Sequence, residues 1–313
     1  MPRFIRICAA LIAVCFIVAI QACDMNSDLA IHKAEKKIAA LKHAAEQGDV
    51  KAQYDLGVTY AALNDDAEAL KWVSKAAEQG DAKAQVNLAR MYYHGRGVDQ
   101  SYTEAVKWFR LAAEQENTQA QYSLGQMYRR GRGVDLDYME AMKWIRKAVE
   151  KGNADAQYVL GLMYSTNGQG VGQDYAETAK WIHKSAEQGN ARAQVELGSM
   201  YLFGRGVKQD FAEGVKWTRK AAERGNVRGQ VLLGSMYADG LFMRQNYREA
   251  AMWHRKAAEQ GSALSQFTLG RMHHTGQGVR RSDKEAAKWW RLAAEQGYEA
   301  AGKALEDMER ARR

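Results

Sequence analysis

Proline is nearly absent from this chain of 313 residues, since Pro2 is the only one. Cysteine is almost as rare: Cys8, Cys15 and Cys23 are the three in the chain, and all lie close to its start. No disulfide can therefore form within the rest of the chain, which must be held together by packing alone. No linker rich in proline, serine or glycine interrupts residues 29–308, which indicates one continuous elongated domain.

Residue patterns that carry catalysis or bind metals are missing as well. The histidines show no metal-ligand spacing, and the adjacent His273 and His274 point to different helix faces. No serine, histidine and aspartate trio can be singled out, and the recurring Gly-x-Gly-Val segment lacks a lysine at phosphate-loop spacing. We therefore expect a protein with no catalytic residue, no metal and no cofactor.

What the sequence has in abundance is a repeat. Seven tryptophans recur every 36 residues, with a single step of 37 between Trp144 and Trp181. A fixed period in this range marks a unit that cannot bury its own apolar face and must stack on copies of itself. We expect these tryptophans to form the structural core of the repeats; they are Trp72, Trp108, Trp144, Trp181, Trp217, Trp253 and Trp289.

Each unit is predicted to be a helical hairpin. In the third copy, both halves carry apolar residues on one helix face. The first half has Ala120, Leu124, Met127 and Tyr128, and the second has Tyr138, Ala141, Trp144, Ile145 and Ala148. Gly131 and Gly133 lie between the halves, where they end the first helix and reverse the chain.

Counting the Leu-Gly positions, such as Leu124-Gly125, gives seven hairpins. A glycine inside a helix costs about 1 kcal/mol relative to alanine, so its recurrence implies a close approach of the neighbouring helix. We expect the tryptophan to lie opposite this glycine and to pack between successive hairpins. Two copies depart from the pattern: the first has a shorter turn at residues 61–66, and the sixth has Gly240-Leu241-Phe242 in place of Gly-x-Gly.

The unit closely resembles the Sel1-like repeat, a subclass of the tetratricopeptide-type α-solenoids. The segments that carry the resemblance are Leu124-Gly125-Gln126-Met127-Tyr128, Gly131-Arg132-Gly133-Val134, Ala141-Met142-Lys143-Trp144 and Ala148-Val149-Glu150-Lys151-Gly152. The resemblance implies an all-α fold, a right-handed α/α superhelical solenoid of helical hairpins. It says far less about function, because a fold does not fix a function.

The sequence divides into four parts. Residues 1–22 are interpreted as a signal peptide, with Cys23 as the mature N-terminus. Residues 29–48 form an N-terminal capping helix, residues 49–298 form the seven repeats, and residues 299–313 form a C-terminal capping helix with a basic tail. Solenoids need such terminal half-units to cover their exposed faces.

The signal segment has a basic start at Arg3 and Arg6, followed by fourteen apolar residues at 7–20. This run is short for a membrane span but typical of a secretory signal. Ile20-Gln21-Ala22-Cys23 resembles the lipobox of bacterial lipoproteins, in which the cysteine is acylated. We therefore expect a lipid anchor at Cys23 on the periplasmic face of the cell envelope; the alternative is ordinary cleavage after Ala22 and secretion.

Surface charge and variable positions indicate where a partner binds. The net charge is +8, and the turn arginines could attract an anionic envelope component, while a signal peptide argues against a nucleic-acid partner. In helical-hairpin solenoids the first helices line the concave groove, where aromatic, arginine and polar residues favour binding. The predicted groove residues are Lys83, Arg90, Tyr93, His94, Gln126, Arg129, Arg130, Ser199, Arg271 and His274. The apolar position two before each leucine, such as Tyr122, is interpreted as core packing.

These features predict a non-catalytic scaffold that binds a protein partner or an envelope component in its groove. The first alternative is an enzyme acting on a small molecule derived from the cell wall, because some cysteine-rich members of the resembled family have been linked to β-lactams. Those members carry a disulfide in each repeat, which this chain lacks. The second alternative is an exported factor that interacts with a host, if Cys23 is not acylated.

Overall fold

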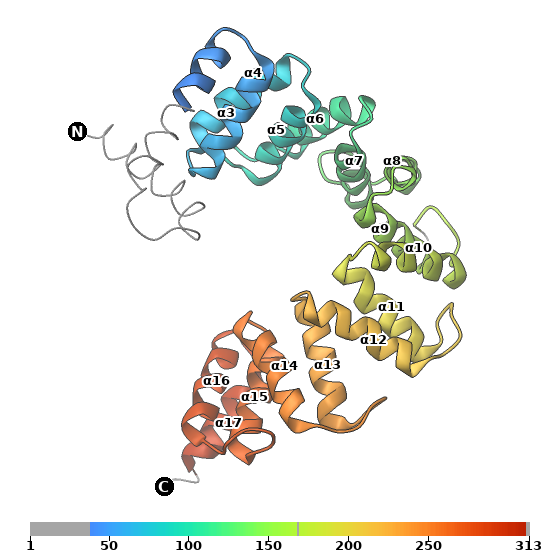
Figure 1. Ribbon diagram of the computed structural model, residues 1–313, viewed down its shortest axis with the longest axis vertical. Helices are drawn as coiled ribbons and strands as arrows, with labels where there is room; N and C mark the ends of the chain where they lie inside the picture. The colour runs from blue at the N-terminus through green and yellow to red at the C-terminus, as the bar shows by residue number, and fades with distance from the viewer. Residues whose placement is uncertain (1–37, 168, 311–313) are drawn as a thin grey trace, which may run out of the picture. The chain divides into compact units, whose positions relative to one another are not determined.

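The computed structural model describes residues 38–167 and 169–310. These residues form α-helices joined by turns, with no strand among them (Figure 1). The predicted all-α fold of stacked hairpins is confirmed. The predicted signal peptide at 1–22, Cys23 and the first part of the capping helix at 29–48 lie outside the described residues.

The chain divides into two compact units, one running through Asn153 and the other beginning at Ala154. The first unit contains helical residues 38–46 and then α3 (Val50–Ala62), α4 (Asp66–Glu78), α5 (Ala82–His94), α6 (Tyr102–Glu114), α7 (Thr118–Arg130) and α8 (Tyr138–Glu150). The second contains α9 (Ala154–Tyr164), α10 (Tyr175–Glu187), α11 (Ala191–Phe203), α12 (Phe211–Glu223), α13 (Val227–Asp239), α14 (Tyr247–Glu259), α15 (Ala263–Thr275), α16 (Asp283–Glu295) and α17 (Glu299–Arg310). None of the helices in these ranges is both long and apolar enough to cross a membrane.

Short polar side chains fix where the helices begin. The Asn117 side chain accepts a hydrogen bond from the backbone N–H of Ala120 at 3.0 Å, which caps α7. Asp137 does the same for α8, where it accepts from the N–H groups of Met139 and Glu140. Such bonds satisfy backbone donors that have no partner within the helix. Gly131 then ends α7 in the left-handed conformation, with φ of 60°.

The helical glycines allow the two helices of one hairpin to approach closely. A Cβ atom at Gly125 would lie 2.6 Å from Cγ1 of Ile145, and one at Gly57 would lie 2.6 Å from a methyl group of Val73. The close approach inferred from the sequence is therefore present. The glycine faces the residue that follows the tryptophan, however, so the expectation that tryptophan itself lies opposite is wrong.

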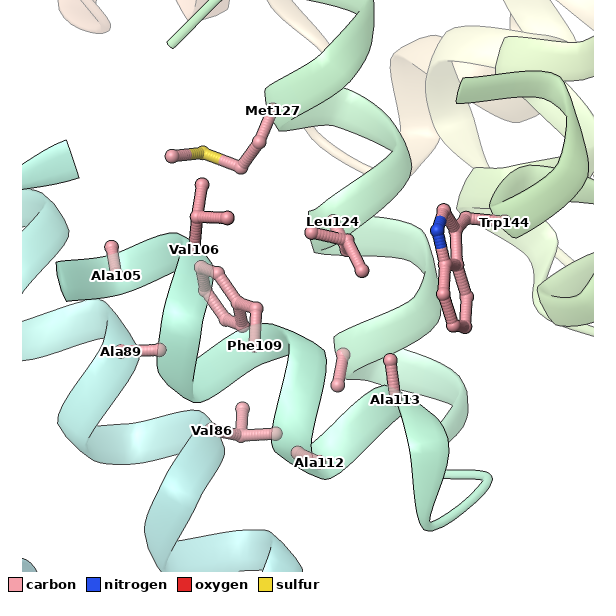
Figure 2. Close-up of a cluster of buried hydrophobic side chains, with 11 residues drawn as sticks. Val86, Ala89, Ala105, Val106, Phe109, Ala112, Ala113, Leu124, Met127 and Trp144 are labelled. Atoms are coloured by element: carbon pink, nitrogen blue, oxygen red, sulfur yellow. The ribbon is translucent and has the colours of Figure 1, made fainter. Parts of the chain in front are cut away.

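The tryptophans pack between successive hairpins, as the sequence predicts. Trp144 on α8 belongs to a buried cluster with Ala112 and Ala113 on α6 and Leu124 on α7 (Figure 2). Trp217 on α12 joins residues of α10 and α11 in the same way. Trp72, Trp144, Trp217, Trp253 and Trp289 are buried, whereas Trp108 and Trp181 are half-buried.

In the second, third, fifth and seventh hairpins, the second glycine of the Gly-x-Gly turn packs against the preceding hairpin. A Cβ atom at Gly133 would lie 2.3 Å from the carbonyl oxygen of Tyr102, and one at Gly206 would lie 1.9 Å from that of Tyr175. Both glycines also have positive φ, of 70° and 67°. Glycine is the residue that fits these two constraints together.

Within each of the two units, a buried glutamine links a hairpin to the one before it. In α5, Gln85 donates from Nε2 to the carbonyl oxygen of Ala77 at 3.2 Å, and its Oε1 accepts from Gln115 at 2.9 Å. Gln115 also donates to the carbonyl oxygen of Gly80. The pair therefore ties one hairpin to main-chain groups of its predecessor, away from water.

Two hairpins lack the second glutamine of this pair. Lys151 stands in its place in the third hairpin and donates to the carbonyl oxygen of Glu116, and Arg224 stands there in the fifth and donates to that of Gly189. The buried Oε1 atoms of Gln121 and Gln194 are left without a hydrogen-bond partner in the described part of the chain. An unpaired buried acceptor is destabilising.

We predict that Lys151→Gln stabilises the protein by about 1 kcal/mol, because the new side chain can donate to Gln121 Oε1. The lost ion pair with Glu116 is exposed to solvent and contributes little. The reverse change, Gln115→Lys, should destabilise by a similar amount. Urea denaturation of both variants measures the effect, and stability changes of the same sign would contradict the pairing.

One buried position is occupied by histidine. His254 on α14 takes the place that Ile145 holds on α8 and is 1% exposed. Its Nδ1 lies 3.2 Å from Ser265 Oγ, while its Nε2 has no partner within residues 38–167 and 169–310. Burial, with a smaller contribution from the positive charge of Arg271, lowers the pKa of His254 to about 4.

This histidine makes stability depend on pH in a defined direction. Below pH 6.5 the unfolded chain binds a proton at His254 that the folded chain resists until about pH 4. We predict that His254 lowers the free energy of unfolding by about 3 kcal/mol as the pH falls from 6.5 to about 4. His254→Leu should remove this part of the loss in urea denaturation, while Ile182→Leu, at the equivalent position, should keep it. Equal pH dependence in all three proteins would exclude the effect.

Candidate protein-binding site

The predicted groove residues of the first unit lie on two first helices. Lys83, Arg90, Tyr93 and His94 belong to α5, and Gln126, Arg129 and Arg130 belong to α7. A hollow of about 220 Å³ between these helices is lined by five of them: Arg90, Tyr93, His94, Gln126 and Arg130. Lys83 and Arg129 do not line it.

The floor of the hollow belongs to the repeat core. Phe109 and Met127 line it and are both buried. They pack with Val106 in the same cluster as Trp144 (Figure 2). The floor is therefore fixed by the packing that holds the hairpins together, and the hollow exists before any partner binds.

One wall is formed by an arginine that reaches back from the turn after α7. The Arg132 guanidinium lies 5.7 Å from the ring centre of Tyr93 and 5.6 Å from that of Tyr102, and it donates a hydrogen bond to the Tyr93 hydroxyl. Cation–π contacts with two rings hold the charge in place. The Tyr93 ring also makes an edge contact with His94, at 4.8 Å between ring centres.

The other wall is a chain of polar side chains along α7. Arg129 donates from Nε to Gln126 Oε1 at 2.9 Å, and Gln126 donates from Nε2 to the Tyr122 hydroxyl at 3.0 Å. Arg129 thus orients Gln126 without lining the hollow itself. Tyr122 is half-buried and lines the hollow, and core packing stays a prediction for it. Val86, at the same position of α5, is buried in the core.

The hollow is strongly cationic. Arg90, Arg130 and Arg132 line it together with His94, and no carboxylate is among its lining residues. Within the described residues, neither Arg90 nor Arg130 forms a salt bridge, and both are exposed. Guanidinium groups that are not already paired can bind carboxylates through two parallel hydrogen bonds.

A second hollow of about 430 Å³ lies on the other side of α5, between this helix and the first hairpin. It also includes Arg90 and His94, and it reaches across α5 to Gly57, Val58 and Ala61 on α3. Arg90 and His94 therefore lie between two depressions. An extended segment could cross both of them in passing from α7 to α3.

The remaining predicted groove residues belong to the second unit. Ser199 on α11 donates from its hydroxyl to the carbonyl oxygen of Val195 at 3.1 Å. His274 on α15 has its Nδ1 2.8 Å from Asp283 on α16 of the same hairpin, and its ring lies 5.5 Å from that of Trp290. Arg271 is exposed on α15. Ser199 and His274 thus form contacts within their own hairpins. The binding role of Ser199, His274 and Arg271 stays a prediction.

The sequence does not predict Arg132 as a site residue, although the rings of Tyr93 and Tyr102 hold it in place at the hollow. Arg132 attracts attention in the sequence only as a turn cation, because nothing local indicates that it contacts Tyr93 of the preceding hairpin. Its position in the repeat could have indicated this contact. Arg132 directly precedes Gly133, and Gly133 packs against the preceding hairpin. Cys23, the predicted lipid attachment site, lies outside the described residues.

The stacked hairpins with a cationic, aromatic-walled hollow on their first helices define an α-solenoid of the repeat type. The chain belongs to the Sel1 repeat family. The family model matches seven consecutive segments, at residues 50–81, 82–117, 118–153, 154–190, 191–226, 227–262 and 263–298. The predicted number of repeats is confirmed. Sel1 repeat proteins are generally protein-interaction scaffolds.

Two solved structures resemble this chain in both sequence and fold. One is c5321, a protective antigen present in uropathogenic Escherichia coli strains, with 38% identity, a TM-score of 0.72 and coverage of 86% of this chain. The chain spans 58% of the length of that structure. The other is a Sel1 repeat protein from Oxalobacter formigenes, with 32% identity, a TM-score of 0.72, and coverage of 78% of this chain and 99% of that one.

A more distant likeness shows the fold alone. The yeast protein Tom70 matches 92% of this chain and 61% of its own, at 17% identity and a TM-score of 0.55. No curated protein matches the sequence significantly.

Proposed function

We propose that this protein is a non-catalytic adaptor of the bacterial cell envelope that binds an acidic segment of a partner protein on the first helices of its N-terminal hairpins. The observation that carries the proposal is the hollow between α5 and α7. It combines three arginines with exposed and half-buried aromatic and amide groups, and no carboxylate lines it. Arginine and tyrosine are the residues that most often dominate binding energy in protein interfaces.

The geometry supports a side chain or chain end carrying a carboxylate as the group that enters. A hollow of about 220 Å³ is small for a folded domain but adequate for one acidic side chain. Arg132 is held by Tyr93 and Tyr102, so little conformational freedom is lost when it pairs with a ligand. Arg90 and Arg130, at the rim, supply attraction and orientation.

We predict that Arg90→Glu combined with Arg130→Glu weakens partner capture about tenfold or more, because a carboxylate ligand would meet like charge in place of two guanidinium groups. The measurement is quantitative mass spectrometry after crosslinked pull-down from the native envelope. Helical content from circular dichroism should not change, because both side chains are exposed.

The matched control is Arg255→Glu combined with Arg291→Glu, which makes the same change in net charge on second helices remote from the hollow in sequence. It should leave capture intact. A set of captured proteins that is the same for wild type and both double variants would exclude this site. Loss of capture in both would show that net charge, and not the hollow, governs binding.

We further propose that the adaptor is tethered to the periplasmic face of the envelope through an acylated Cys23. The proposal is supported by the basic start, the apolar run at 7–20 and the lipobox-like segment that ends at Cys23. A single acyl group holds a protein weakly, and two or more hold it stably, so lipoprotein-type modification would give a lasting anchor.

We predict that mass spectrometry of the protein purified from native membranes detects a diacyl or triacyl glycerol-modified Cys23 as the N-terminal residue. Cys23→Ala should release the protein from the membrane fraction or block its maturation. An unmodified N-terminus at any other residue would exclude the anchor and favour the secreted alternative.

A further inference from the structure

The turn of the sixth hairpin departs from a rule that the turns at Gly97, Gly133, Gly206 and Gly278 obey. The second turn glycine of its neighbours presses against the backbone of the preceding hairpin, as Gly206 does against Tyr175 and Gly278 against Tyr247. Phe242 stands at this place in the sixth hairpin, and it keeps the left-handed backbone with φ of 64°. A bulky residue in this conformation is strained.

The strain accompanies an exposed aromatic cluster. The Phe242 ring lies 5.0 Å from that of Phe211 and 6.4 Å from that of Phe203, measured between ring centres. Phe203 is 62% exposed and Leu241 is 55% exposed, and Phe211 and Phe242 are exposed as well. We call Phe203, Phe211, Leu241 and Phe242 the phenylalanine patch. Contiguous exposed apolar groups of this kind mark interaction surfaces.

The patch is bordered by positive charge. Arg205 lies 6.0 Å from the ring centre of Phe203, and Lys208 and Arg244 are exposed in the same two turns. Residues 204–210 and 240–246 contain one carboxylate, that of Asp210, and it accepts a hydrogen bond from the backbone N–H of Glu213. The two turns thus combine exposed apolar side chains with three cationic ones, and the carboxylate of Asp239 is exposed directly before the second turn.

From this combination we infer that the phenylalanine patch docks onto the surface of an anionic lipid bilayer. Aromatic rings enter the boundary between headgroups and acyl chains, while neighbouring arginine and lysine side chains bind lipid phosphates. The patch lies at two turns, and none of its residues lines the depression bounded by Trp217 and Lys220 in the same unit. Exposed turns suit a bilayer surface better than they suit a peptide.

This membrane contact is separate from any anchor at Cys23 and from the hollow between α5 and α7. It requires neither of them to be correct. It also explains why a strained residue stands at position 242. Glycine there would relieve the backbone strain but would remove the ring that contacts both Phe203 and Phe211.

The test is hydrogen–deuterium exchange of the full chain, read peptide by peptide, with vesicles of phosphatidylglycerol and phosphatidylcholine or of phosphatidylcholine alone. This readout is local, so an N-terminal anchor that holds the protein on vesicles does not obscure it. We expect the turns at 204–210 and 240–246 to gain protection on the anionic vesicles only. The equivalent turn at 131–137 serves as the internal reference and should not change.

Phe242→Gly is the decisive variant, because it restores the glycine of the other turns and should fold at least as well as wild type. It should lose the vesicle-dependent protection while its thermal unfolding temperature stays the same or rises. The control Leu136→Ser changes an exposed apolar residue in the turn of the third hairpin and should keep the protection.

Three results with the wild-type chain would overturn the inference. These are no protection of the two turns on anionic vesicles, equal protection on neutral vesicles, or protection that appears without lipid and grows with protein concentration. The last would identify the patch as a contact between copies of this chain. Unchanged protection in Phe242→Gly would also contradict it.

Discussion

The structure depends on one constraint: no hairpin can bury its own apolar face. The second helix of each hairpin must pack against its own first helix and also against the preceding hairpin. The contact between the two helices of one hairpin needs a glycine. At Gly125, for example, the side chain of Ile145 lies too close for a Cβ atom. The contact with the other hairpin is made by the tryptophan, since Trp144 packs on α6 and α7. The period of 36 residues follows, because both contacts must recur in the same register.

That register explains what the sequence predicts well and what it does not. The hairpins, their number and their glycines are predictable because the same residue type returns at the same spacing. The buried glutamines also recur, three residues before the leucine in all seven copies, as Gln121 does before Leu124. Their role was missed because glutamine is usually exposed, and burial becomes visible only with the main-chain oxygen it binds. The Arg132 contact with Tyr93 joins residues 39 apart, and no pattern within one repeat indicates it.

We expect the functional residues at positions whose residue type can differ from one repeat to the next. A position that packs must keep its residue type, whereas a position that faces outward can differ between copies. Arg90 and Arg130 illustrate this freedom at the hollow, and Phe242 illustrates its limit, because it replaces a packing glycine and strains the backbone. The strongest indicators of function are therefore departures from the repeat that bring polar or aromatic groups to the surface.

The glutamine pair has a consequence for how such a chain can evolve. Both glutamines of a pair come from one hairpin, and on the preceding hairpin they bind only main-chain oxygens, those of Ala77 and Gly80 in the second copy. Every hairpin offers such oxygens whatever its side chains are. Each hairpin thus supplies all the side chains of this contact. When a copy is gained by duplication or lost by deletion, the two hairpins that become neighbours can still form the same hydrogen bonds. The length of the array can change without redesign of its interfaces.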